Sequence, residues 1–196
     1  MADDMIPATD TRVEVARLLT ELLGSADVQN HVAGQLMRGD GETLALTDPA
    51  TGKIFAEFPD AGAAVVNAAA EAAVAAQREW WGKTASERGR IMFEIARQIR
   101  SHAEPLSRLE AISAGRPIRD AAGEPARMAE MFEYYAGWCD KITGDVIPVP
   151  SSHLNYTRHE PIGVVTQITP WNAPLFTCCW QVAPAICAGN AVMLKP

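Results

Sequence analysis

Apolar residues recur at helical spacing in several separate stretches of the chain. Residues 11–23 form the first of these stretches, and Gly24 predicts the end of that helix. Further helices are expected over Asp60–Trp80 with Asp60 as the cap, after the capping-box pair Thr84 and Glu87, over Glu104–Ala114 and over Pro125–Asp140. The spacing predicts the following inward faces: Val65, Ala69, Ala73, Ala76 and Trp80; Ile91, Ile95 and Ile99; Met128, Phe132, Tyr135 and Cys139.

Extended segments are predicted between and after these helices. His31–Met37, Thr43–Leu46 and Lys53–Phe58 indicate a small antiparallel unit, with turn-forming residues at Asp48–Gly52. Val146–Val149 and His153–Arg158 indicate a second extended pair, because polar and apolar positions alternate along the latter segment.

From Ile162 the pattern changes to strand, turn, helix and strand. The expected elements are a strand over Ile162–Ile168, a helix over Pro174–Cys187 and a strand over Ala191–Leu194 that leads into Lys195. Such a unit implies parallel strands joined by a right-handed crossover, and ligands bind at the carboxyl ends of such strands. The turn between Thr169 and Pro174 lacks the G-x-G-x-x-G fingerprint, which argues against a standard dinucleotide turn at this point.

Composition and charge narrow the class of protein. The net charge of −7 argues against nucleic acid as a partner and gives no attraction to an anionic membrane. The acidic N-terminus is unlike a secretory signal, and four cysteines without a framework spacing fit reduced thiols in a cytoplasmic protein. Pro161–Leu194 lacks charge and leaves a membrane span open as a minor alternative, but its prolines and polar residues favour a buried parallel sheet instead.

Several short motifs resemble the aldehyde dehydrogenase superfamily from about Gln35 to the last residue. They are EPIGVV, PWNAP, APAICAGN and LKP within Glu160–Pro196, and DPATGK, SERGRI, LSRLEAISAGRPI and GDVIPV earlier in the chain. The resemblance implies an α/β fold: the N-terminal part of a Rossmann-type cofactor domain, with a helical layer and an oligomerisation β-arm. Residues 1–25 would be an N-terminal extension and 26–196 a truncated aldehyde dehydrogenase domain. Within that domain, 141–160 would form the oligomerisation strands and 161–196 the first strand-helix-strand of the cofactor domain.

The resemblance also assigns roles at matching positions. The Asn172 carboxamide would donate a hydrogen bond to the aldehyde oxygen, although its place before the helix also allows it to be an N-cap. The Lys195 ammonium would contact the adenosine ribose of NAD or the 2′-phosphate of NADP. The cofactor crevice would be lined by Ile168, Thr169, Pro170 and Trp171, although Trp171 could equally be part of the core. No metal is implied.

The chemistry implied by the family needs residues that these 196 positions do not supply. A nucleophilic cysteine and a general-base glutamate are expected further along a full-length parent, so the chain alone is expected to be inactive. Cys178 and Cys179 lie in an apolar helix without a histidine nearby in sequence, which makes them poor substitutes. NAD(P)-dependent oxidation of a small-molecule aldehyde by a homo-oligomeric parent, a dimer or tetramer, is the leading hypothesis. A non-catalytic short form that pairs with full-length subunits is the main alternative.

Overall fold

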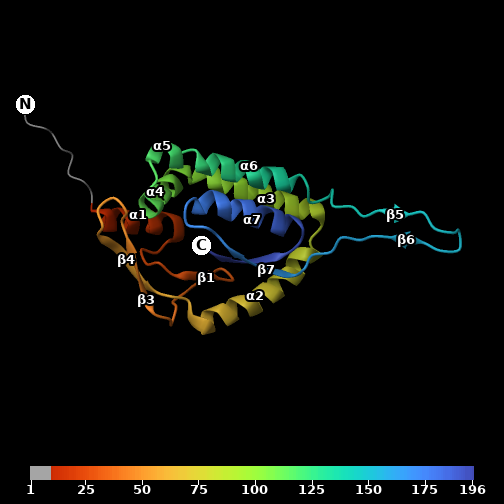
Figure 1. Cartoon of the computed structure of the whole chain (residues 1–196), viewed down its shortest axis with the longest axis horizontal. Coiled ribbons are helices and arrows are strands. Elements are labelled where there is room, and N and C mark those ends of the chain that lie inside the picture. Colours follow the sequence, from red (N-terminus) through yellow and green to blue (C-terminus); the bar gives the residue numbers. More distant parts are fainter. Residues whose placement is uncertain (1–9) are drawn as a thin grey trace, which may run out of the picture. The chain divides into compact units, whose positions relative to one another are not determined.

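The computed structural model describes residues 10–196, and the chain divides into two compact units. The first unit comprises the described residues up to Ala68 together with His102–Glu124, and the second comprises Ala69–Ser101 together with Pro125–Pro196 (Figure 1). Residues 1–9, which begin the expected N-terminal extension, lie outside the described residues. Each unit mixes helices with short strands, so the predicted α/β class is confirmed.

The first unit contains helix α1 from its first chain segment, helices α4 and α5 from its second segment, and two antiparallel hairpins. Its elements are α1 (Thr11–Leu23), β1 (Asn30–Val32), β2 (Gln35–Met37), β3 (Thr43–Thr47), β4 (Ile54–Pro59), α4 (Ala103–Ala114) and α5 (Ile118–Ala121). The prediction of a single strand over His31–Met37 is wrong. Ala33 and Gly34 take positive φ angles of 48° and 80°, which turn the chain back between β1 and β2.

A small apolar cluster and one polar turn hold the first unit together. Val15 and Leu19 of α1 pack with Phe55 of β4. Asp48 is buried in the turn between β3 and β4, where it accepts hydrogen bonds from the Ala50 N–H at 2.8 Å and the Thr11 hydroxyl at 2.9 Å. These donors hold the pKa of the Asp48 carboxyl below its usual value. The segment that sequence indicated as a turn is therefore fixed by its first residue.

The second unit carries the longer helices and a parallel strand pair. Helix α2 (Gly62–Gly82) enters it at Ala69, and the further elements are α3 (Ala85–Ser101), α6 (Glu124–Ala136), β5 (Val146–Ile147), β6 (Asn155–Tyr156), β7 (Val164–Ile168), α7 (Pro174–Cys187) and β8 (Ala191–Lys195). Strands β5 and β6 pair antiparallel, whereas β7 and β8 pair parallel. The predicted strand-helix-strand is confirmed, with β7 starting two residues later than expected.

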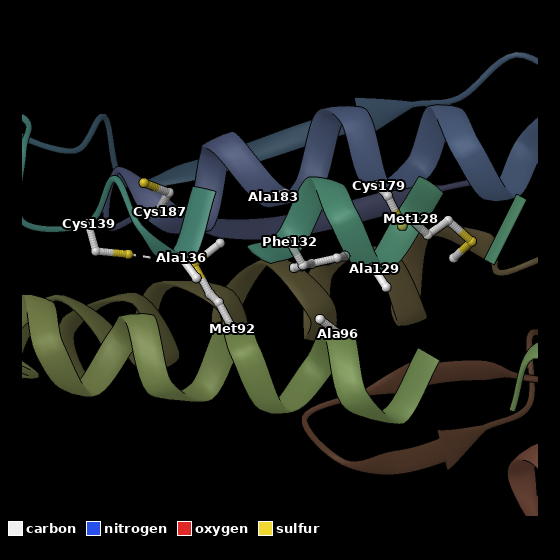
Figure 2. Packing of buried hydrophobic residues seen from close by; sticks show 10 residues of the cluster. All are labelled: Met92, Ala96, Met128, Ala129, Phe132, Ala136, Cys139, Cys179, Ala183 and Cys187. Atoms are coloured by element: carbon white, nitrogen blue, oxygen red, sulfur yellow. Dashed lines mark hydrogen bonds between the residues drawn. The ribbon is translucent and has the colours of Figure 1, made fainter. Parts of the chain in front are cut away.

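The core of the second unit lies where α3, α6 and α7 meet (Figure 2). It contains six sulfur-bearing or aromatic side chains among small alanines, and its members are Met92, Ala96, Met128, Ala129, Phe132, Ala136, Cys139, Cys179, Ala183 and Cys187. The Cys139 Sγ lies 3.6 Å from the Met92 Sδ. Close packing of small residues lets the three helices approach and exclude water from this cluster.

Three helix predictions need correction. In α3, the prediction is wrong for Ile91, which is 39% exposed, whereas Ile95 and Ile99 pack against the core as predicted; the fully buried positions are Met92 and Ala96. Helix α6 ends at Ala136, so Cys139 reaches the core from the turn that follows rather than from the helix. Helix α2 begins at Gly62, so Asp60 is not at the cap position.

The inward face of α2 also differs from prediction at one position. Ala76 is exposed, and Gln77 occupies the row between Ala73 and Trp80. The Gln77 amide donates to the Gly189 carbonyl oxygen at 3.1 Å, which explains why a polar side chain faces inward there. The apolar spacing could not reveal this, because the partner lies far along the chain.

Candidate functional site

Parallel pairing of β7 with β8 brings two distant parts of the sequence to the carboxyl end of both strands, which is called the β7–β8 edge from here on. Ile168, the last residue of β7, is paired with Lys195, the last residue of β8. Beyond the strand, the Thr169 N–H donates to the Lys195 carbonyl oxygen at 3.0 Å, and the Thr169 hydroxyl donates to the same oxygen at 3.4 Å. The turn that follows β7 therefore lies beside Lys195, at the carboxyl end of both strands, where doubly wound sheets bind ligands.

The turn from Thr169 to Ala173 presents most of its side chains to solvent. Trp171 is 84% exposed and Ile168 is 69% exposed, whereas Thr169 is buried by its bonds to Lys195. The exposure of Trp171 contradicts the alternative that it is part of the core. Four of the predicted crevice residues thus lie along one edge, with Thr169 oriented inward.

Asn172 is exposed just before α7. The helix begins at Pro174, and the residue at its cap position is Ala173, whose side chain makes no capping hydrogen bond. The N-cap alternative for Asn172 is therefore wrong. Proline at the first helical position is compatible with α7, because that position needs no backbone donor.

Lys195 is the only charged residue after Glu160 in the sequence, and its side chain is exposed. Its ammonium donates to the Pro196 carbonyl oxygen at 3.1 Å. A cation at the end of a strand, next to an exposed turn and in an otherwise uncharged stretch, can bind hydroxyls or a phosphate of a ligand at this edge.

A groove that the sequence did not reveal lies between α6 and α7. It has a volume of about 510 Å³ and is lined by Arg127, Glu130, Met131, Tyr134, Tyr135, Phe176 and Trp180. The Phe176 and Trp180 rings contact edge to face at 5.1 Å, and so do those of Tyr134 and Tyr135. Aromatic residues spaced by four in α7 were the available signal, since that spacing brings side chains onto one helical face.

The turn at the other end of α7 is closed and hydrogen-bonded. The Asn190 amide donates to the Ala185 carbonyl oxygen at 3.0 Å and accepts from the Gly163 N–H at 3.0 Å, so Asn190 connects the end of α7 to the residue before β7. Gly189 has a φ of 89°, and a Cβ at this position would lie 2.3 Å from the Trp81 ring. Both the backbone angle and the ring exclude any larger residue there.

Comparison with known proteins decides which family has this arrangement. The sequence model of the aldehyde dehydrogenase family matches residues 36–196. The chain belongs to the aldehyde dehydrogenase family. It is 39% identical over 160 residues to retinal dehydrogenase 2 of Homo sapiens, a match that covers 80% of the chain and 31% of that protein. It is 40% identical over 158 residues to aldehyde dehydrogenase family 2 member B4, mitochondrial, of Arabidopsis thaliana, with 79% and 29% covered.

A solved structure has the same fold over most of the chain. The crystal structure of PnpE in complex with nicotinamide adenine dinucleotide superposes with a TM-score of 0.82 at 40% identity, covering 86% of this chain and 35% of that one. PnpE comes from Pseudomonas sp. WBC-3. The chain thus spans about a third of the length of these relatives.

Two of the four cysteines of this aldehyde dehydrogenase chain, Cys179 and Cys187, are unsuited to nucleophilic attack, whereas the hydrogen bond with Cys179 lowers the pKa of Cys178. Cys179 and Cys187 are buried in the core of the second unit, and all four thiols are free. Burial raises the pKa of Cys187 to about 12, and the hydrogen bond with Cys178 together with burial raises the pKa of Cys179. A thiol with a raised pKa is almost entirely protonated at neutral pH, so it lacks the thiolate that attacks a carbonyl.

Two further sequence-based alternatives can be compared with the structure. Within residues 10–196, no group of three or more histidine, cysteine or acidic side chains is placed to bind a metal ion. No described helix combines the length and the apolar character that a bilayer crossing requires. The uncharged stretch Pro161–Leu194, which raised the membrane alternative, forms β7, the 14-residue α7 and most of β8.

Proposed function

We propose that the whole protein oxidises an aldehyde to a carboxylic acid with NAD or NADP, and that the β7–β8 edge forms part of its active site. The observation that carries this proposal is the parallel pairing of Ile168 with Lys195, which brings the Asn172 turn and a lone cation to one edge. Support comes from membership of the aldehyde dehydrogenase family and from a relative crystallised with NAD.

Asn172 is the proposed donor to the aldehyde oxygen. Its carboxamide is exposed beside the edge, so a substrate can reach it. When a thiolate attacks an aldehyde, the carbonyl oxygen gains negative charge, and an amide N–H held nearby stabilises that charge. Removal of one such donor costs about 3 kcal/mol of transition-state stabilisation. The family resemblance assigns the thiolate to a cysteine of a longer polypeptide.

The edge fits the binding of a dinucleotide. Ile168, Pro170 and Trp171 offer exposed apolar surface, and the Lys195 ammonium would donate to the adenosine ribose hydroxyls of NAD or the 2′-phosphate of NADP. When bound, the nicotinamide supplies the acceptor for the hydride that leaves the aldehyde carbon. Thr169, buried against Lys195, would act by holding the strand ends together rather than by side-chain contact.

The groove between α6 and α7 is the proposed site for the remainder of the aldehyde. Phe176 lies in the first turn of α7, four residues after Asn172, so a substrate whose oxygen meets Asn172 would extend over Phe176 and Trp180. Truncation of Trp180 to alanine should raise the KM for a bulky apolar aldehyde more than the KM for acetaldehyde. Equal changes for both substrates would argue against this assignment.

The β5–β6 hairpin is the proposed contact to a neighbouring subunit in a homo-oligomer. Its apolar side chains are solvent-exposed in the described chain: Val146 is 74%, Leu154 is 76% and Tyr156 is 61% exposed. Exposed apolar residues gathered in one hairpin are typical of surfaces that another chain covers. Val146→Asp combined with Leu154→Asp should therefore lower the mass of the whole protein in light scattering.

One pair of measurements tests the proposed function directly. The polypeptide encoded by the whole reading frame should produce NADH or NADPH, followed at 340 nm, when an aldehyde is added. Residues 1–196 alone should produce none. Aldehyde-dependent reduction by residues 1–196 would overturn the expected inactivity. Co-purification of residues 1–196 with a longer subunit, from a host where both are expressed, would favour the non-catalytic partner instead. A cytoplasmic location remains the expectation from the composition.

A further inference from the structure

The α7–β8 turn is held from outside by side chains that occur more than a hundred residues earlier. The Trp80 indole N–H donates to the Ile186 carbonyl oxygen at 2.8 Å, and Gln77 donates to the Gly189 carbonyl oxygen at 3.1 Å. The Trp81 ring lies so close to Gly189 that no Cβ fits between them. Gln77, Trp80 and Trp81 of α2 therefore contact the last turn of α7 and Gly189, the second residue after it.

Arg88 fixes the Trp81 ring in turn. Its guanidinium carbon lies 5.1 Å from the ring centroid, and its Nη1 donates to the Lys83 carbonyl oxygen at 2.8 Å. Arg88 is only 5% exposed, although its partners here are an indole ring and a carbonyl oxygen rather than a carboxylate. Arginine is seldom buried to this extent without a charged partner. A desolvated guanidinium over an indole face gives a stronger cation–π attraction than an exposed one. The ring therefore has one well-defined place against Gly189.

The position of this turn bears on the proposed cofactor edge. Helix α7, which has 14 residues and follows Asn172, ends at this turn. Strand β8 starts just after the turn and ends at Lys195. The helix spans roughly 21 Å and the strand roughly 16 Å. A change of about 5° in the direction of β8 relative to α7 would displace Lys195 relative to Asn172 by roughly 1.5 Å over the length of the strand. A displacement of this size is enough to break a hydrogen bond.

We propose that Trp81 and Arg88 are positioning residues for Lys195: by fixing the α7–β8 turn, they set where the Lys195 ammonium meets the adenosine half of the cofactor. This inference rests on the proposed function. It assigns a binding role to the junction of α2 and α3, whose residues lie at the opposite end of β8 from the cofactor edge. A purely structural role would change stability without acting through Lys195.

The test is a double-mutant cycle on cofactor binding in the polypeptide encoded by the whole reading frame. The dissociation constant of NAD, or of NADP if the wild type prefers it, is measured by titration calorimetry for Trp81→Ala, Lys195→Ala and the double variant. Each single variant should bind about tenfold more weakly. The double variant should bind no more weakly than Lys195→Ala, because Trp81 acts through Lys195.

Matched variants separate positioning from general loss of stability. Trp81→Phe keeps a ring against Gly189 and should retain most of the affinity, whereas Gly189→Ala displaces the ring and should repeat the effect of Trp81→Ala. Met92→Ala truncates a fully buried core residue of α3 and should lower the melting temperature with unchanged affinity.

Each outcome has a distinct meaning. Additive losses in the double variant, or an unchanged affinity of a folded Trp81→Ala, would overturn the positioning role. The same loss in Met92→Ala would also overturn it, since general destabilisation would then explain the effect. An unchanged affinity of Lys195→Ala would instead contradict the proposed cofactor contact itself, so the two failures are distinguishable.

Discussion

The two turns at the ends of α7 are built on opposite principles. The β7–α7 turn exposes Trp171 and Asn172, whereas the α7–β8 turn buries Gly189 and Asn190. The Asn190 side-chain amide both donates and accepts a backbone hydrogen bond there. The first lies at the carboxyl end of the strands, where ligands bind in such folds, and the second lies at the opposite end. One strand-helix-strand unit thus separates a turn available for chemistry from a turn that secures the structure.

The largest expected effect concerns the exposed turn. Asn172→Ala in the polypeptide encoded by the whole reading frame should lower kcat/KM for aldehydes by about 10²- to 10³-fold, because one donor to the developing oxyanion is lost. Its melting temperature should stay close to that of the wild type, since the side chain is exposed. Activity within a few-fold of the wild type would contradict the catalytic role of Asn172.

The buried turn should show the reverse pattern. Asn190→Ala removes the acceptor of the Gly163 N–H and the donor to the Ala185 carbonyl oxygen, both at 3.0 Å. The free energy of unfolding in urea should fall by about 1–3 kcal/mol, the typical cost of leaving a buried polar group without a partner. Asn155→Ala, on the exposed β6 strand, is the matched control and should change little. Equal losses of unfolding free energy in Asn190→Ala and Asn155→Ala would contradict a stabilising role specific to the α7–β8 turn.

Two tryptophans give a finer comparison of the same turns. Trp80→Phe loses the indole N–H bonded to the Ile186 carbonyl oxygen and should cost about 1 kcal/mol of stability. Trp171→Phe changes a ring that is 84% exposed and should stay within about 0.5 kcal/mol of the wild type. Chemical denaturation measures both, and a larger loss for Trp171→Phe would mean that the β7–α7 turn also carries stability.

The last comparison depends on pH and concerns the last residue of α7. Burial raises the pKa of the Cys187 thiol to about 12, compared with about 8.5 in an unfolded chain. The unfolded state therefore loses this proton first, so the contribution of Cys187 to stability is full below about pH 8.5 and is lost as pH rises toward 12. Cys187→Ala should reduce the fall in melting temperature between pH 8 and pH 10. A fall in melting temperature between pH 8 and pH 10 that is the same in Cys187→Ala as in the wild type would contradict burial of the thiol.

The sequence predicted the strand-helix-strand unit well because its signals are local. Pro174 and Cys187 are the observed bounds of α7 as well as the expected ones, since a proline starts the helix and Gly189 follows its end. The parallel pairing of β7 with β8 followed from the handedness rule for such connections. The roles of Asn172 and Lys195 came from family resemblance and remain predictions.

Contacts between distant segments limited the remaining predictions. Apolar spacing pointed to Ile91 in α3, but packing against α6 and α7 selects Met92 and Ala96. Gln77 and Trp81 gave no signal, because their partner is a glycine more than a hundred residues later. The spacing of Phe176 and Trp180 places both rings on one face of α7, but the groove also needs α6, so the pattern in α7 alone does not reveal the rest of its lining.

The contacts between α2 and the α7–β8 turn also have a consequence for synthesis on the ribosome. Gln77 and Trp80 meet partners 112 and 106 positions later in the chain. At translation rates of about 5–20 residues per second, the inward face of α2 would wait roughly 5 to 20 s for those partners. During that interval Trp80 and the alanines beside it are exposed to other nascent chains and to chaperones. Slow elongation between these segments should therefore increase aggregation more than slow elongation after residue 196.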